Sequence, residues 1–143
     1  MTVARILSEK GRNVVMTQPH RTVAEAAWIL AENNIGALVV TDARERILGI
    51  FTERDIVRVI GRLGSAALGD AVSKYMTTCV ETVHEDESVD MAMEKMTLGR
   101  FRHLPVVSGD RLDGIVSIGD VVKHRLETLE HEHRAMREYI AHA

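Results

Sequence analysis

The sequence predicts an α+β fold made of two similar halves followed by a C-terminal helix, and three observations support this prediction. With 143 residues and 45% hydrophobic content, the chain can bury a core of ordinary size. The second half repeats the first at an offset of 66 residues. In each half, helix-like and strand-like hydrophobic patterns follow one another in the same order.

The internal repeat extends from the first helix of each half to the last. It keeps an offset of 66 up to the first strand of the hairpin, loses one residue in a polar turn, and continues at an offset of 65. The aligned pairs are Thr22–Ser88, Val23–Val89, Ala26–Ala92, Leu38–Leu104, Val40–Val106, Gly49–Gly114, Ile50–Ile115, Asp55–Asp120 and Val57–Val122. The chain therefore contains two copies of one structural unit.

Each copy predicts a β-α-β-β-α unit. The helices follow from apolar residues at i, i+3, i+4 and i+7, and the two central strands are short apolar runs joined by a polar turn. The expected elements are strand 13–17, a helix from Val23, strands 37–40 and 47–51, and a helix near Thr52, then strand 79–83, a helix from Val89, strands 104–107 and 112–117, and a helix near Ser117. Because one unit alone leaves an apolar face exposed, we expect the two to pack face to face about a pseudo-twofold axis.

Three regions are expected along the chain: a first repeat at 8–62, a second repeat with its linker at 63–126, and a helical tail at 127–143. The tail has no counterpart after the first repeat. Its apolar stripe spans less than three heptads, which is too short to be stable without packing. The stripe consists of Leu126, Leu129, His133, Met136 and Ile140. We expect it to pack either on its own domain or against a second copy of the chain.

Composition argues against several partners and chemistries. A net charge of -3 and 3% aromatic residues leave no basic surface or stacking platform, so neither nucleic acid nor an anionic membrane is expected as a partner. The single Cys79 cannot form an internal disulfide, and the first residues have no apolar signal core, which together indicate a cytoplasmic setting. The histidines show no zinc-ligand spacing, and no nucleophile, Walker or Rossmann pattern occurs. Neither a metal site nor an enzyme is expected.

One short motif occurs at the end of the hairpin in both halves. Gly49–Asp55 and Gly114–Asp120 each place a hydroxyl residue after an apolar strand and an aspartate three residues later, at the start of a helix. In a structural interpretation the two side chains form a capping box. In a functional interpretation the free amides and the hydroxyl bind a phosphate, while the aspartate accepts two ribose hydroxyls. Both interpretations use the same geometry and can coexist, with the capping box in the free protein and ligand contacts in the bound protein.

With these units and motifs the chain resembles the CBS (cystathionine β-synthase) domain, and the tandem pair resembles a Bateman module over residues 8–126. The resemblance implies a non-catalytic regulatory module that binds AMP, ADP, ATP or a related adenosine ligand between its repeats and signals to an unidentified partner. NAD and S-adenosylmethionine share the adenosine half and stay open as ligands, and no cofactor is required. A ligand-independent interaction or scaffold module is the alternative. Because CBS pairs commonly form flat dimers, a homodimer is favoured.

The resemblance also assigns residues to two sites. Thr52 and Asp55 are implied to hold the phosphate and the ribose in the first site, and Ser117 and Asp120 in the second. The adenine slots are implied near Val14 and Ile35 for the first site, and near Thr78, Cys79 and Val80 for the second.

Basic residues are expected to make the two sites unequal. Arg102 and His103 precede the strand at 104–107, a place from which CBS pairs direct basic side chains toward the phosphate of the other repeat. Arg54 lies within the first motif, where the second has Gly119. The first site is therefore expected to prefer charged phosphates. The second has little cationic help and is expected to take a nucleoside-like ligand or to stay empty.

Overall fold

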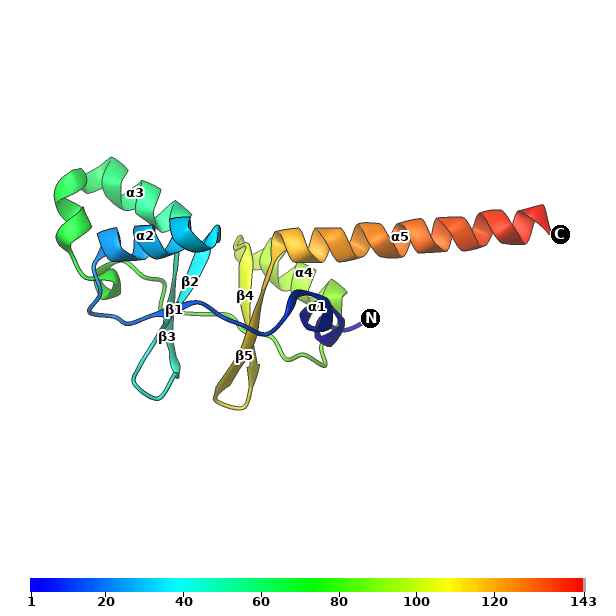
Figure 1. The fold of residues 1–143 in the computed structure, drawn as a ribbon, viewed down its shortest axis with the longest axis horizontal. Coiled ribbons are helices and arrows are strands. Elements are labelled where there is room, and N and C mark those ends of the chain that lie inside the picture. Colours follow the sequence, from blue (N-terminus) through cyan, green and yellow to red (C-terminus); the bar gives the residue numbers. More distant parts are fainter. Residues whose placement is uncertain (143) are drawn as a thin grey trace.

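Two α/β lobes lie side by side in the computed structural model, which describes residues 1–142, and one long helix extends away from the second lobe (Figure 1). The first lobe contains β1 (Met16–Thr17), α2 (Val23–Asn33), β2 (Ala37–Thr41), β3 (Ile47–Thr52) and α3 (Glu53–Leu63). The second contains α4 (Val89–Gly99), β4 (His103–Ser108), β5 (Arg111–Ser117) and α5 (Ile118–Ala141). Helix α1 (Val3–Lys10) precedes the first lobe, and two 3-10 helices connect the lobes, η1 (Ser65–Gly69) and η2 (Val72–Lys74). The predicted α+β class and the C-terminal helix are confirmed.

The two sheets differ by one strand. In the first lobe β1 pairs in parallel with β2, and β2 pairs antiparallel with β3. In the second lobe the described residues form a sheet of β4 and β5, and the strand expected at 79–83 is reduced to one parallel bridge between Val83 and Val106. One residue earlier, the carbonyl of Thr82 accepts a hydrogen bond from Lys95 Nζ at 2.9 Å. The expectation of a three-stranded sheet is therefore wrong for the second repeat.

Each lobe has its own apolar core, and each core includes a segment from outside its own hairpin and helices. In the first lobe Phe51 packs in one cluster with Val72 of η2. In the second lobe Leu104 packs in one cluster with Ile6 and Leu7 of α1. All of these side chains are at most 4% exposed. The N-terminal helix is thus part of the second lobe in space, although it precedes the first lobe in the sequence.

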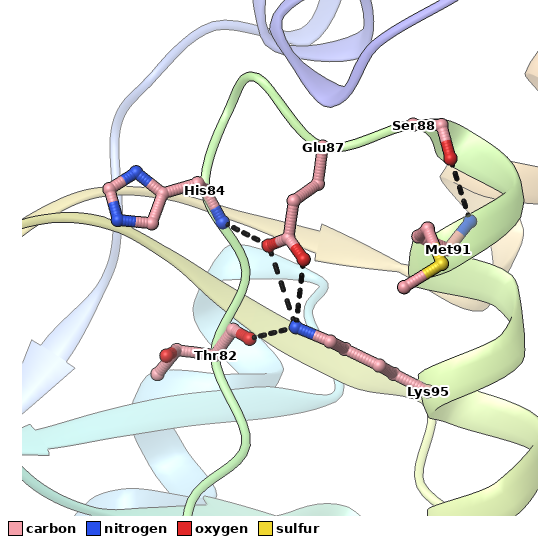
Figure 2. Close-up of polar contacts among 6 residues, drawn as sticks. All are labelled: Thr82, His84, Glu87, Ser88, Met91 and Lys95. Atoms are coloured by element: carbon pink, nitrogen blue, oxygen red, sulfur yellow. Dashed lines mark hydrogen bonds and ion pairs between the residues drawn. The ribbon is translucent and has the colours of Figure 1, made fainter.

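The turn before α4 holds the start of α1 in place. Glu87 closes this turn, because one carboxylate oxygen accepts the amide of His84 at 2.6 Å and the other lies 3.1 Å from Lys95 Nζ (Figure 2). The His84 amide and then the Lys95 ammonium hold the pKa of Glu87 below its usual value. The backbone carbonyl of Glu87 in turn accepts the amide of Val3 at 2.9 Å. Backbone hydrogen bonds as well as apolar packing therefore orient α1.

Helix α5 continues the second repeat into the tail without a break. Its buried residues lie in the first two turns, whereas Leu129 is 49% and Ile140 66% exposed. The tail projects away from the body of the molecule (Figure 1). The predicted helix is confirmed as far as Ala141, but packing of its stripe on its own domain is wrong. The last residue of the predicted tail, Ala143, lies outside the described residues.

Candidate functional site

Both repeats form the capping box that the sequence predicts. In the first, Asp55 N donates to Thr52 Oγ1 at 3.2 Å and Thr52 N donates to Asp55 Oδ2 at 2.9 Å. In the second, Asp120 N donates to Ser117 Oγ at 3.1 Å and Ser117 N donates to Asp120 Oδ2 at 2.8 Å. Each box turns a strand directly into a helix and places a hydroxyl and a carboxylate at the positive end of α3 or α5. The structural interpretation of the motif therefore holds in both repeats.

A cavity of about 360 Å³ lies where the two repeats meet, beside the first motif. This volume is within the range of small-molecule sites. Residues predicted for nucleotide binding that line it are Thr52, Arg54, Asp55, Cys79, Val80, Arg102 and His103. The other lining residues are Gly36, Ile50, Glu53, Arg58, Thr77, Glu81, Gly99, Arg100 and Phe101. The cavity combines side chains of both repeats with the segment that joins them.

The structure places two residues predicted for the second adenine slot beside the first motif. Cys79 and Val80, expected in the second site, line the cavity of the first. The reason is a backbone bridge, in which Thr77 and Ile50 of β3 exchange hydrogen bonds of 2.9 and 3.0 Å. The chain that enters the second repeat therefore runs along the edge of the first sheet. Thr78 is exposed and is not among the lining residues.

Val14 and Ile35 are not among the residues that line this cavity either. Ile35 packs against the core of the first lobe, and Val14 is half-buried just before β1. The internal repeat supplies the reason, because Val14 is the counterpart of Val80 at an offset of 66. Since Val80 lies beside the motif of the other repeat, the pseudosymmetry relates Val14 to the second motif.

Four arginines give the cavity a positive wall. Two lie one turn apart on α3, and two lie at and just after the end of α4: Arg54, Arg58, Arg100 and Arg102. Within residues 1–142 none of these guanidinium groups forms an ion pair. The acidic residues on the cavity wall are Glu53, Asp55 and Glu81. Four like charges around one cavity repel one another, and a bound anion relieves that repulsion.

Sequence reasoning missed Arg58 and Arg100. Arg58 could have been found, because it follows Arg54 by four residues on a predicted helix and so lies on the same face. Arg100 could not, because only the fold shows that the end of α4 borders this cavity. Its backbone is left-handed, with φ 55°, which is unfavourable for a residue of this type. The pseudosymmetric position in the first repeat is Asn34, with φ 51°.

A basic side chain also lies beside the second motif. Lys10 Nζ donates to Asp120 Oδ2 at 2.6 Å and to Ile115 O at 2.8 Å. Burial opposes the ionisation of Asp120, but hydrogen bonds from Lys10 and from the Ser117 amide outweigh it and hold the pKa of Asp120 below its usual value. The expectation that this motif has little cationic help is therefore wrong. The helix that carries Lys10 packs on the second lobe, although it comes before the first in the sequence.

Comparison with known proteins agrees with this architecture. The CBS domain family matches residues 3–62 and 72–127, which is most of the chain. This chain belongs to the CBS domain family. The crystal structure of a CBS-domain containing protein from Agrobacterium tumefaciens is similar with a TM-score of 0.85 and 49% identity, over 87% of this chain and 99% of that one. The chain spans about two thirds of the length of the curated relatives that it matches at 30% to 43% identity.

Two similar CBS proteins have been solved with adenosine ligands. The CBS domain pair of protein MJ0100, 29% identical with a TM-score of 0.81 over 90% of this chain and 98% of that one, is in complex with 5'-methylthioadenosine and S-adenosyl-L-methionine. The CBS domain protein PAE2072 from Pyrobaculum aerophilum, 28% identical with a TM-score of 0.75 over 84% of this chain and 89% of that one, is complexed with AMP. Solved CBS proteins of this fold thus include binders of AMP and of S-adenosyl-L-methionine.

In this CBS pair His103 lies close to charged groups of both motifs. Burial lowers its pKa, the charge of Lys10 lowers it further, and Glu53 and Asp120 act in the opposite direction without restoring the usual value. A Cβ atom added to Gly36 of the first repeat would lie 3.5 Å from the His103 ring. The imidazole is therefore at the junction of the repeats, and the neutral form is favoured.

Neither a metal cluster nor a membrane segment occurs among residues 1–142. No three His, Cys, Asp or Glu side chains in this range gather in a way that could hold a metal ion. None of its helices combines the length and the apolar character that crossing a membrane requires. Cys79 is a free and exposed thiol on the cavity wall.

Proposed function

We propose that this CBS pair is a regulatory module that binds an adenine nucleotide by its phosphates in the cavity between its repeats. The observation that carries the proposal is the set of four arginines, none of them ion-paired within residues 1–142, that shares one cavity with the Thr52–Asp55 capping box. Guanidinium groups, a hydroxyl and the amides at a helix N-terminus are the groups with which proteins bind phosphate. The structural role of the box supports this use, because it presents these groups in a fixed orientation.

Each part of an adenine nucleotide has a complementary surface in this cavity. Asp55 uses Oδ2 for its capping bonds, and Oδ1 has no hydrogen-bond partner among residues 1–142, so Oδ1 is the proposed acceptor for the ribose hydroxyls. Ile50 and Val80 offer an apolar contact for the adenine ring. The phosphates then extend toward the arginines. Because these come from both repeats, a bound nucleotide would join the repeats by its own contacts.

The charge of the cavity discriminates among the adenosine ligands. S-adenosylmethionine carries a net positive charge and adds to the repulsion among the arginines, whereas ADP, ATP and the pyrophosphate of NAD relieve it. The AMP complex of PAE2072 supports a ligand with a phosphate, and the complex of MJ0100 supports the adenosine part alone. We therefore rank ADP and ATP above AMP and NAD, and S-adenosylmethionine last.

Helix α3 is the proposed route from the ligand to a partner. Arg54 and Arg58 line the cavity, while Val57 and Ile60 on the same helix are 70% and 40% exposed. A ligand that changes the position of α3 therefore also changes an apolar surface on the outside of the module. A partner bound to that surface responds to the ligand by a shift between two populations of the module.

A second surface, the exposed apolar face of α5, supports a homodimer of two copies of this chain. Its exposed apolar residues are Val122, Leu126, Leu129, Met136, Tyr139 and Ile140. An apolar stripe of this length is typical of an interaction surface. The charges along its outer part, from 127 to 137, change sign, with Glu127, Glu130 and Glu132 before Arg134 and Arg137. Two tails in antiparallel orientation therefore pair opposite charges on either side of the apolar contact.

Truncation after Thr128 tests the homodimer. It removes exposed residues of the tail and leaves the buried His124 in place, so the folded lobes are expected to keep their melting temperature. Analytical ultracentrifugation should show a dimer for the full chain and a monomer for the truncated one. An unchanged mass after truncation places the subunit contact elsewhere.

Isothermal titration calorimetry with ATP, ADP, AMP, NAD, adenosine and S-adenosylmethionine tests the proposed function. The protein should first be shown free of co-purified nucleotide by native mass spectrometry. Affinity is expected to rise with phosphate charge, and adenosine and S-adenosylmethionine are expected to bind weakest. If none of the ligands gives a binding signal at millimolar concentration, the ligand-independent scaffold function is favoured instead. Tighter binding of S-adenosylmethionine than of ADP would contradict the charge argument.

A further inference from the structure

The two capping aspartates have different partners. Among residues 1–142, Asp55 accepts side-chain or amide hydrogen bonds from Thr52 alone. Asp120 accepts the matching amide bond from Ser117, and its Oδ2 also accepts the ammonium of Lys10 at 2.6 Å. The carboxylate of the second motif is therefore already bound to a cation from the chain itself.

The internal repeat has no cation beside the first motif at the position aligned with Lys10. The parallel pairings of the two lobes keep the offset of 66 in the segments that precede the sheets. At that offset Lys10 aligns with Met76 in the sequence, although in space the place of Met76 above Gly49 corresponds to that of Leu7 above Gly114. Met76 packs against the core of the first lobe, and its Sδ would lie 2.8 Å from a Cβ atom added to Gly49. The first motif thus has an uncharged thioether in its neighbourhood where the second has an ammonium group.

The position of Lys10 is set by the packing of α1. Leu7, one turn earlier, is 1% exposed and fills the space above Gly114, where an added Cβ atom would lie 2.8 Å from Leu7 Cδ2. The helix then ends at Gly11, whose φ of 97° suits glycine. The ammonium is held by Ile115 O at 2.8 Å as well as by the carboxylate. With side chains 34% and 24% exposed, the Lys10–Asp120 pair is more protected than a solvated surface pair.

We propose that Lys10 is an internal latch that occupies Asp120 and closes the second ribose position, so that nucleotide binds at the first site alone. The inference rests on the proposed function in one respect, because it treats the two motifs as equivalent ribose holders. A ribose hydroxyl makes a weaker bond to a carboxylate than an ammonium group does. A ligand that enters the second site must therefore give up the stronger bond for the weaker one.

The substitution Lys10→Met tests the latch, because it removes the ammonium group and keeps an unbranched side chain of similar length. Calorimetry with ADP should show one site in the wild type and two in Lys10→Met. The additional site should disappear in the double variant Lys10→Met with Asp120→Ala. Lys10→Arg retains a cation at this position and is the matched control, with one site expected. Melting curves of all four proteins check that each is folded.

The possible results separate the latch from the proposed function. A wild type that binds two ADP molecules, or a Lys10→Met variant that still binds one, overturns the latch and leaves the first site intact. A wild type that binds none, together with a Lys10→Met variant that gains one Asp120-dependent site, supports the latch and overturns the proposed function. Absence of binding in both proteins overturns the two together.

Discussion

The Thr52–Asp55 and Ser117–Asp120 boxes begin α3 and α5 with the same pair of hydrogen bonds, and their sequences follow one pattern. Their surroundings differ. The first box shares a cavity with four arginines that form no ion pair within residues 1–142, whereas the aspartate of the second is bound to Lys10. The motif fixes the local backbone geometry, and charges from other segments decide what each copy can bind.

The charges that distinguish the two motifs come from segments that are not equivalent positions of the internal repeat. The arginines at 100 and 102 belong to the second repeat and reach the motif of the first. Lys10 belongs to a helix that precedes β1 of the first lobe in the sequence and packs on the second lobe. Pseudosymmetry in the fold therefore coexists with asymmetry in the electrostatics, and the following changes test that difference from the largest expected effect to the smallest.

Asp55→Ala should have the largest effect on ADP binding. The variant loses the ribose acceptor of the first site, and loss of a hydrogen bond to a charged group weakens binding by roughly tenfold to a hundredfold. Asp120→Ala is the matched control, because it breaks the same capping box in the second repeat. Calorimetry should show near-normal ADP affinity for this control. Equal losses in the two variants would show that the boxes act through fold stability and not through the ligand.

Arg102→Ala should weaken ATP and ADP by roughly tenfold while leaving adenosine almost unaffected, because only the phosphates use the guanidinium group. Arg134→Ala in the exposed tail is the control for loss of one positive charge elsewhere. The same titrations measured at two salt concentrations should show a smaller salt dependence for Arg102→Ala than for the wild type. A parallel loss of adenosine binding would assign Arg102 to the base or the ribose instead.

His103 should make the ligand-free protein less stable in acid. Because folding lowers the pKa of this imidazole, its contribution to stability is present above the unfolded value of about 6.5 and is lost as the pH falls through the lower native value. His103→Gln removes this titration, so its melting temperature should fall less between pH 7 and pH 5 than that of the wild type. Identical slopes for the two proteins would contradict the direction of the pKa shift.

Arg100→Asn should have the smallest effect of these substitutions. It should raise the free energy of unfolding slightly and lower the affinity for ATP. Asparagine tolerates the left-handed backbone that arginine adopts here, so urea unfolding should show a gain of about 0.5 to 1 kcal/mol. ATP affinity should fall, because one of the four positive charges is lost. A loss of stability on this substitution would mean that Arg100 makes a structural contact that the free guanidinium does not suggest.

The fold could be predicted because local patterns determine it. Alternation of helical and strand periods, repeated at one offset, identified the hairpins of both lobes and the helices on either side of them, but not α1. The motif at Thr52 and Ser117 identified both capping boxes. The third strand predicted for the second sheet is reduced to one bridge, and the Thr82 carbonyl bonds the Lys95 side chain instead. Hydrophobic periodicity does not show that a side chain such as Lys95 will take a backbone carbonyl from the sheet.

The candidate site could be predicted only in part. Thr52, Arg54 and Asp55 are adjacent in the sequence, and the structure places them on one cavity with Arg102 and His103. Cys79 and Val80 lie beside the other motif than expected, because their position depends on which sheet edge the linker follows. Lys10 and Arg100 were missed for a related reason. Their contacts join segments that are distant in the sequence and have no shared motif.

An amide NMR titration of the ligand-free protein with ADP tests the central claim most directly, because it locates the ligand on each repeat separately. The account predicts that the backbone signals of Thr52, Asp55, Arg102 and His103 shift in a saturable way, while those of Ser117 and Asp120 change little. Shifts centred on Ser117 and Asp120, with the first motif unaffected, would contradict it.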